Sequence, residues 1–337
     1  MERAKIEDVA EAAGVSIMSV SRAMRGVEGL SPKTRAKILK IAKRMNYQPS
    51  SVAGALAAAN STLIGVSVPT LDDAVFGEIF EGMRPVFNRL GFQTVFDTTE
   101  YRPEREEAWI ERMIAWRPAG IVLSGITHSR TSRRKLSESG IPTLEIWDYS
   151  ADPIDICIGI DHREAGRQAA RYLLSLGYHR PAYVGVEQGR DVRADKRVQG
   201  FREVFDAAGC ALIADVRLSD AVSFEAGQKG VSELLARAAQ PDVVHFLNDH
   251  MAFGGKLEFE RCGVPVPQGV GIVGFNGLNI NGVLDQPITT IKTPRAQMGK
   301  AGATMLVARI ANAITQRAVL MQPELIEGGT TRAAHQI

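Results

Sequence analysis

The chain has 337 residues, of which 45% are hydrophobic and 23% charged, enough to bury a sizeable core in two or three compact units. It contains no apolar run of about eighteen residues, and its first residues, MERAKIEDVAEAAG, are charged where a secretory signal is apolar. We therefore expect a cytoplasmic protein with no membrane partner. The three widely spaced cysteines exclude a disulfide framework and a paired-cysteine zinc site.

Charge is distributed unevenly along the chain. Residues 1–60 hold ten Lys/Arg and five Asp/Glu, whereas the remainder is mildly acidic although the whole chain carries a net charge of +2. No acidic residue occurs between Glu28 and Asp72, a stretch with six basic residues. This asymmetry favours a polyanionic partner for the amino-terminal module, with a solvated helix face as the alternative.

Three short helices are predicted in the first fifty residues. Gly14 is a typical carboxyl-terminal stop for the first helix. Ser16 is placed to cap a second helix that ends near Gly26, and Ser31 with Pro32 is placed to begin a third. The apolar residues expected to face the core are Ile6, Val9, Ala10 and Ala13 in the first helix, Met18, Val20, Met24 and Val27 in the second, and Ile38, Leu39, Ala42 and Met45 in the third.

Two helices joined by so tight a turn predict a helix-turn-helix, whose second helix enters the major groove of DNA with its first residues facing the bases. The groove-facing set would be Ser16, Ile17, Met18, Ser19 and Arg22. Arg22 can donate two hydrogen bonds to guanine, the serines can contact phosphates, and the apolar pair can pack on thymine methyl groups. A three-helix bundle without a DNA-binding role is the alternative.

From residue 61 onward, β-branched runs alternate with amphipathic helical patterns, which predicts parallel sheets covered by helices on both faces. Ten strands are too many for one such sheet, so we expect two doubly wound subdomains. Pro85 interrupts one helical pattern and predicts a kink there. The expected strands are residues 62–68, 92–97, 120–124, 142–146, 156–160, 181–186, 212–217, 242–247, 270–275 and 288–292.

Open parallel sheets bind ligands beyond the carboxyl ends of their strands, so polar and aromatic residues after strands are candidates for ligand binding. Phe76 and Trp147 could stack on a ring or chain of the ligand. The GVGIVG stretch at residues 269–274 is interpreted as strand, because the next residues, FNGLNINGVLDQP, cannot open a helix at the third glycine. The histidines have no metal-ligand spacing and no nucleophile motif occurs, so no metal, cofactor or catalytic residue is expected. The candidates at these strand ends are Phe76, Ser124, His128, Trp147, Asp148 and Asp161.

The stretches IEDVAEAAGVSIMSVSRAMRG and LSPKTRAKILKIAKRMNYQPSSVAGALA resemble the amino terminus of the LacI/GalR family of bacterial transcriptional regulators, and the resemblance extends through the whole chain. It implies a helix-turn-helix head on a periplasmic-binding-protein-like body, acting as a homodimer on double-stranded operator DNA. It also implies a hinge that becomes helical on DNA, where Leu56 would wedge into the minor groove. The hinge is too short to form a stable helix alone. Ser31 and Tyr47 complete the expected DNA-binding set.

Three further motifs resemble ligand-binding elements of this family. RVQGF places Arg197 at the position of an arginine that members use on ligand hydroxyls or carboxylates, and FLNDHMAFG places Asn248 and Asp249 in the expected pocket. IVGFNG has Asn276 where many members carry a sugar-binding aspartate. Losing that carboxylate removes a repulsion against an anionic ligand and favours a sugar acid, with neutral drift at this position as the alternative. The GF-x-G ending also resembles the gluconate-type repressors.

The predicted domains are a helix-turn-helix head at 1–47, a hinge at 48–60 and an effector-binding and dimerisation domain at 61–337. Its amino-terminal subdomain would comprise about 61–161 and 293–321, and its carboxyl-terminal subdomain about 162–292 and 322–337. The predicted function is repression of genes for sugar-acid uptake or breakdown, relieved by gluconate or ketogluconate. A neutral-sugar or purine-type regulator, a ligand acting as co-repressor, a sugar-binding transport protein and a doubly wound enzyme are the alternatives.

Overall fold

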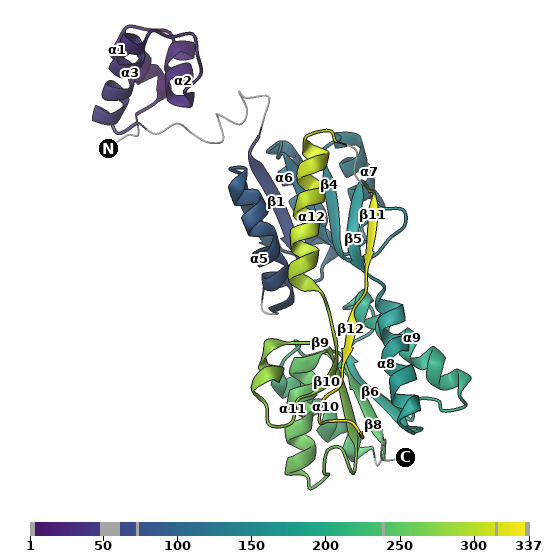
Figure 1. Ribbon diagram of the computed structural model, residues 1–337. Helices are drawn as coiled ribbons and strands as arrows, with labels where there is room; N and C mark the ends of the chain where they lie inside the picture. The colour runs from purple at the N-terminus through teal and green to yellow at the C-terminus, as the bar shows by residue number, and fades with distance from the viewer. Residues whose placement is uncertain (1–3, 48–60, 72–73, 238–239, 314–315, 334–337) are drawn as a thin grey trace. The chain divides into compact units, whose positions relative to one another are not determined.

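The computed structural model describes residues 4–47, 61–71, 74–237, 240–313 and 316–333. The chain forms two compact units, Met1–Thr62 and Leu63–Ile337, called the head and the body below (Figure 1). Within the described ranges, no helix has both the length and the apolar character needed to cross a membrane.

The head consists of α1 (Ile6–Ala13), α2 (Ile17–Arg25) and α3 (Pro32–Arg44). Gly14 and Gly26 end the first two helices with left-handed φ values of 65° and 73°, which glycine adopts without strain. The Ser16 hydroxyl accepts a hydrogen bond from the Ser19 amide at 3.2 Å, and Ser31 caps α3 in the same way. The helix ends predicted from the sequence are therefore confirmed.

The core of the head differs in part from the expected one. Met18 and Val27 are 63% and 48% exposed, and Leu39 is 40% exposed, so these predicted core residues are wrong. The nine-residue α2 has room for only one narrow stripe of buried side chains, and Met18 lies on the opposite face. The buried residues of the head are Val9, Ala10, Ala13, Val20, Ala23, Ile38 and Ala42.

The body contains two six-stranded sheets. The first has the order β11-β5-β4-β3-β1-β2 and the second the order β12-β10-β9-β8-β6-β7. Neighbouring strands are parallel except for β12, which runs antiparallel to β10. The first sheet comprises β1 (Leu63–Val68), β2 (Gln93–Thr98), β3 (Gly120–Ser124), β4 (Thr143–Asp148), β5 (Ile156–Ile160) and β11 (Ala318–Met321). The second comprises β6 (Pro181–Val186), β7 (Ala214–Leu218), β8 (Val243–Phe246), β9 (Gly271–Asn276), β10 (Thr289–Lys292) and β12 (Glu324–Ile326).

All ten predicted strands are confirmed, whereas β11 and β12, which follow α12, were not predicted. Helix α5 continues through Pro85 as one helix. Helices α5 (Ala74–Arg89), α6 (Pro103–Ala115), α7 (Arg130–Ser139) and α12 (Arg295–Ile310) accompany the first sheet. Helices α8 (His162–Ser175), α9 (Val192–Ala207), α10 (Phe224–Ala236) and α11 (Asp249–Arg261), with the 3-10 turn η1 (Asn279–Val283), accompany the second (Figure 1).

Three helix pairs of the body, α5/α12, α8/α9 and α10/α11, pack with glycines against the partner's backbone. In α5/α12, a Cβ atom at Gly82 would lie 2.2 Å from the Ala296 carbonyl oxygen, and one at Gly299 would lie 1.8 Å from the Ile79 carbonyl oxygen. Such distances allow no side chain, so each helix is fixed at backbone contact with its partner. The corresponding glycines of the other two pairs are Gly166, Gly200, Gly227 and Gly254.

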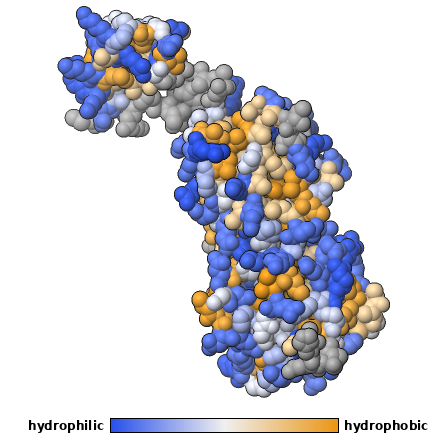
Figure 2. Space-filling model, viewed as in Figure 1, coloured by the Kyte–Doolittle hydropathy of each residue, from blue (hydrophilic) through white to orange (hydrophobic). Residues whose placement is uncertain are grey.

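The chain passes between the two sheets three times: after β5, after β10, and between β11 and β12 (Figure 1). Each sheet with its helices forms one half of the body. A buried apolar cluster runs through both halves and includes Trp147, Phe275 and Ile291. Figure 2 shows apolar side chains among a hydrophilic majority on the visible face of the body, where the first half carries α12 and β11. The subdomain boundaries predicted from the sequence stay a prediction.

Candidate functional site

The exposed face of α2 begins with two large apolar side chains. Ile17 and Met18 are 47% and 63% exposed, although burial is the usual state of such residues. The Ser16 and Ser19 hydroxyls lie 3.0 Å apart beside them, and Arg22 follows one turn later. This combination at the start of the second helix matches the reading surface of a helix-turn-helix.

The other predicted DNA-binding residues have different positions. Ser31 caps α3 and is exposed. Tyr47 is half-buried and packs against the core of the head, and burial, with a smaller effect of Glu7, raises its pKa. Leu56 and the predicted hinge lie outside the described residues.

The body has a cavity of about 470 Å³ at the carboxyl ends of strands from both sheets. This volume is within the range of small-molecule sites. Five residues predicted from the sequence line it: Phe76, Trp147, Arg197, Asn248 and Asn276. Phe76 and Trp147 lie edge to face, with ring centroids 6.3 Å apart, and provide apolar wall.

Arg197 reaches the cavity from α9 and is only 4% exposed. Its guanidinium lies 4.0 Å from the centroid of the Phe275 ring, and Nη2 donates to the Leu247 carbonyl at 3.3 Å. Nε has no hydrogen-bond partner, and in the described part of the chain no carboxylate lies within ion-pair distance. Burial lowers the pKa of Arg197. The cavity wall therefore holds a desolvated cation without a counter-ion in contact among the described residues.

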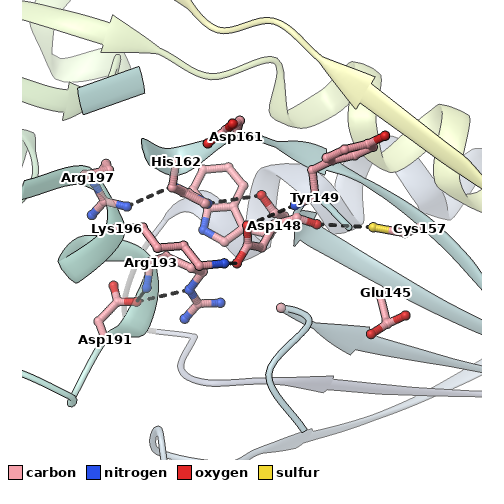
Figure 3. A network of polar contacts seen from close by, with 12 residues as sticks. Glu145, Asp148, Tyr149, Cys157, Asp161, His162, Asp191, Arg193, Lys196 and Arg197 are labelled. Carbon is pink, nitrogen blue, oxygen red and sulfur yellow. Dashed lines mark hydrogen bonds and ion pairs between the residues drawn. The ribbon is translucent and has the colours of Figure 1, made fainter. Parts of the chain in front are cut away.

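His162 connects this guanidinium to the other half of the body (Figure 3). Arg197 Nη1 donates to His162 Nδ1 at 3.1 Å, and since a guanidinium only donates, Nδ1 must be unprotonated. His162 Nε2 then carries the proton and donates to the Trp147 carbonyl at 3.2 Å. Burial, with the charges of Arg197 and its basic neighbours, lowers the pKa of His162 well below its usual value, so the ring is neutral.

Two other basic residues of α9 contact the strand ends of the first sheet. Arg193 donates to Asp191 at 3.0 Å and to the Ser124 hydroxyl at 2.9 Å, and Lys196 pairs with Asp148 at 2.5 Å (Figure 3). Although burial opposes ionisation of Asp191, the charge of Arg193, with that of Arg197, lowers its pKa. Burial of Asp148 raises its pKa, against the effect of Lys196.

The two asparagines of the cavity wall differ. Asn248 is used structurally, because its Oδ1 caps α11 by accepting from the Met251 amide at 3.1 Å. Asn276 ends β9 with a φ of 106°, and its Oδ1 is buried without a partner among the described residues. Trp147, near the end of β4, also has a positive φ, of 80°. Strained backbone and unpaired polar atoms at the same wall are typical of binding sites.

The remaining predicted ligand residues lie outside this cavity. Ser124 and Asp148 line an adjoining hollow of about 170 Å³, which shares Arg193 with the larger one. His128 is buried, with Nδ1 2.7 Å from Glu106 and Nε2 3.4 Å from Glu145. A ligand would have to displace these carboxylates to bind the His128 ring.

Two acidic residues of the predicted set have structural contacts instead of lining either hollow. Asp161 is the exposed cap of α8 and accepts from the Glu164 amide at 3.0 Å. Asp249 lies under the loop after β9, where it accepts from the Leu278 amide at 2.7 Å and the Thr290 hydroxyl at 2.6 Å. Burial raises the pKa of Asp249 to about 6.

Several wall residues were not predicted, and they share one signal. They follow the carboxyl ends of β2, β6 and β7, and a position just after a parallel strand is the signal that indicates them. They include Glu100, Tyr101, Arg190, Asp191, Arg193 and Ser223.

A helix-turn-helix head joined to a two-sheet body with a ligand-sized cavity defines the class of DNA-binding transcriptional regulators. Residues 5–50 match the family model of bacterial regulatory proteins of the lacI family, and residues 61–327 match that of periplasmic binding proteins and the sugar-binding domain of the LacI family. The chain belongs to the LacI family of DNA-binding transcriptional regulators, whose members are not enzymes.

Curated relatives span nearly the whole chain. The HTH-type transcriptional regulator GntR of Escherichia coli K12 is 31% identical, covering 98% of this chain and 97% of the relative. GntR of Pseudomonas aeruginosa is 33% identical, covering 92% and 90%. Among solved structures, a LacI family regulator from Silicibacter pomeroyi has a TM-score of 0.90 at 34% identity, covering 98% of this chain and 100% of that one.

Proposed function

We propose that this regulator represses genes for the uptake or breakdown of a sugar acid of the gluconate or ketogluconate class. In this proposal a homodimer binds a near-palindromic operator, and the sugar acid releases it. The observation that carries the proposal is Arg197, a buried guanidinium in the wall of the cavity with no carboxylate in contact among the described residues.

Burying a charge without a counter-ion costs several kcal/mol, which a carboxylate arriving in the cavity would recover. The other buried cations beside the cavity are already paired. Asp191 already neutralises Arg193, and Lys196 is paired with Asp148, so Arg197 is the buried cation left for the ligand. Asn276 contributes an amide where a carboxylate would repel the ligand.

The rest of the wall suits a polyhydroxylated chain. The amide of Asn276 can hydrogen-bond to ligand hydroxyls, and Phe76 and Trp147 can pack on the carbon backbone. The relatives named GntR and the resemblance to gluconate-type repressors favour the same class of ligand.

The exposed face of α2 supports the DNA-binding half of the proposal. We propose that Arg22 reads guanine and that the exposed Ile17 and Met18 pack on thymine methyl groups. We propose that the hinge at 48–60 presents Leu56 to the minor groove and that the body dimerises. Figure 2 shows apolar side chains on the face that carries α12 and β11, where Leu320 is 43% exposed, and such a surface favours an interface.

The test is a thermal-shift panel of gluconate, 2-ketogluconate and glucose on the full chain. We expect the two acids to raise the melting temperature and glucose to have no effect, because it brings no carboxylate to Arg197. The Arg197→Met variant should bind gluconate at least about 30-fold more weakly, since a buried charged hydrogen bond is lost. Arg202→Met is the matched control, because Arg202 is on the same helix but pairs with Asp215.

Operator duplexes selected by the protein from random sequence provide the second readout. Gluconate should release them, whereas tighter binding with gluconate would make the ligand a co-repressor. A shift with glucose alone would contradict the sugar-acid proposal.

A further inference from the structure

The second passage of the chain between the sheets leads from β10 to α12 (Figure 1), and Arg295 is the first residue of α12. Its side chain is only 3% exposed. It does not line the cavity, and no motif in the sequence indicated a role for it.

The guanidinium of Arg295 joins the two halves of the body. Toward the second sheet it donates from Nη1 to the Asn276 carbonyl and from Nη2 to the Gly277 carbonyl at 3.1 Å. Toward the first half it forms a two-pronged pair with Glu78 of α5, with Nε and Nη2 at 2.9 and 3.2 Å from the carboxylate oxygens. Only arginine has this forked set of donors.

The carbonyl that Arg295 holds belongs to the strained residue of the cavity wall. The left-handed φ of Asn276, 106°, is uncommon for a residue with a Cβ and persists only where neighbours enforce it. Its carbonyl also accepts from the Thr293 amide at 3.2 Å and the Thr293 hydroxyl at 3.3 Å. Asn276 lines the cavity, and its Oδ1 is buried without a partner among the described residues.

Glu78 is a firm anchor for this arrangement. Helix α5 is held at backbone contact with α12 through Gly82 and Gly299, so the carboxylate and Arg295 belong to one rigid helix pair. On the other side of the loop, Asp249 accepts from the Leu278 amide at 2.7 Å. The end of β9 is therefore held by Arg295 on one side and by Asp249 on the other, an arrangement called the clamp below.

We propose that Arg295, anchored by Glu78, is a positioning residue that holds Asn276 in the conformation that presents its amide to the ligand, and that this contact links the ligand cavity to α5. The proposal depends on the proposed function only in taking the cavity as the ligand site. The clamp itself can be tested without a ligand.

The first experiment measures hydrogen–deuterium exchange of the full-length, ligand-free protein. The amides of Gly277 and Leu278 are bonded to Thr290 and Asp249, and opening of the clamp would expose them. In Glu78→Gln we expect their exchange to be about 10-fold faster than in the wild type, with exchange in α10 and α11 unchanged. Glu81→Gln is the matched control, because Glu81 is on the same helix, 62% exposed, and pairs with Arg84.

Arg295→Lys is the second variant, since lysine keeps the charge but cannot hold both carbonyls and Glu78 together. It should also accelerate exchange at Gly277 and Leu278. Unchanged exchange in both variants would overturn the proposal. Faster exchange spread over α5 and α12 with a lower melting temperature would also overturn it, because it would indicate a merely structural role.

A measurement of gluconate binding separates this inference from the proposed function. If gluconate binds the wild type, Glu78→Gln should weaken gluconate binding at least about 5-fold while leaving the affinity of the ligand-free protein for its selected operator unchanged. Equal gluconate affinity in the two proteins would overturn the positioning role. If gluconate does not bind the wild type, the proposed function fails, and the exchange experiment still decides the clamp.

Discussion

His128 and His162 are both buried in the body, yet their surroundings push their pKa values in opposite directions. His162 lies against Arg197, and its pKa is lowered well below its usual value by burial and by that charge. Burial alone would also lower the pKa of His128, but Glu106 and Glu145 together raise it to about 9. The protonation state of a buried imidazole thus depends on the sign of the nearest charge: a cation lowers its pKa and a carboxylate raises it.

His128 should make the stability of the body depend on pH. Because its folded pKa of about 9 exceeds the usual value of 6.5, its contribution is fully present below about pH 6.5 and is lost as the pH rises through 9. The difference corresponds to about 3 kcal/mol in the free energy of unfolding. Urea unfolding of the wild type and His128→Gln between pH 6 and pH 10 should show the gap between the two proteins narrowing with pH.

His179→Gln serves as the control, because His179 is exposed on the same body. Its stability should stay parallel to that of the wild type over the whole range. A constant gap between wild type and His128→Gln would mean that His128 is neutral in the fold.

At the scale of elements, backbone contact between helices fixes the positions of the binding residues. Helix α9 carries Arg193 and Arg197 and touches α8 through Gly166 and Gly200. Helix α12 begins with Arg295 and touches α5 in the same manner. A side chain at these glycines would have to separate two helices whose residues meet at the cavity.

Two glycines of α5 provide a test within one helix. Gly82→Ala should destabilise the protein by about 2 kcal/mol or more, because its Cβ would lie 2.2 Å from the Ala296 carbonyl oxygen. Gly77→Ala should instead stabilise it by about 0.5–1 kcal/mol, since Gly77 is helical, its Cβ would have no neighbour within 4 Å among the described residues, and alanine has the higher helix propensity. Urea denaturation of the two variants would check both signs.

At the scale of the whole molecule, the proposed mechanism requires the ligand and the operator to bind the same protein with linked affinities. If gluconate weakens operator binding by some factor, the operator must weaken gluconate binding by the same factor, at least about 5-fold for a working switch. Calorimetric titration of gluconate into the protein, alone and saturated with its selected duplex, would measure this factor.

A duplex of scrambled sequence is the control for this titration and should change gluconate affinity less. Equal gluconate affinity with and without the selected operator would show that the ligand has no differential effect on the two states, and release by this ligand would be excluded.

Much of the architecture was predictable from local patterns in the sequence. Hydrophobic periodicity indicated the three helices of the head and ten strands, and the caps at Ser16 and Ser31 with the stops at Gly14 and Gly26 defined helix ends. Met18 and Leu39 were wrongly predicted to face the core. A short helix has several plausible apolar faces, and only packing against its neighbours selects one.

The candidate site was predictable in part. Strand-end position and motif resemblance placed Phe76 and Arg197 in the cavity wall, because both rules depend on short segments of chain. The engagement of His128 by Glu106 and Glu145 was not predictable, since it depends on partners from α6 and β4. The role inferred for Arg295 depends in the same way on Glu78, 217 residues away.

The sequence by itself determined the classes of element, their order, and the basic head with apolar residues at the start of its second helix, because these properties depend on residues within a few turns of one another. Only the tertiary structure decided which charges are paired. Among the described residues it left Arg197 without a carboxylate in contact and set Asn276 in a strained conformation, because burial and counter-ions arise from segments that meet only when the two sheets are assembled.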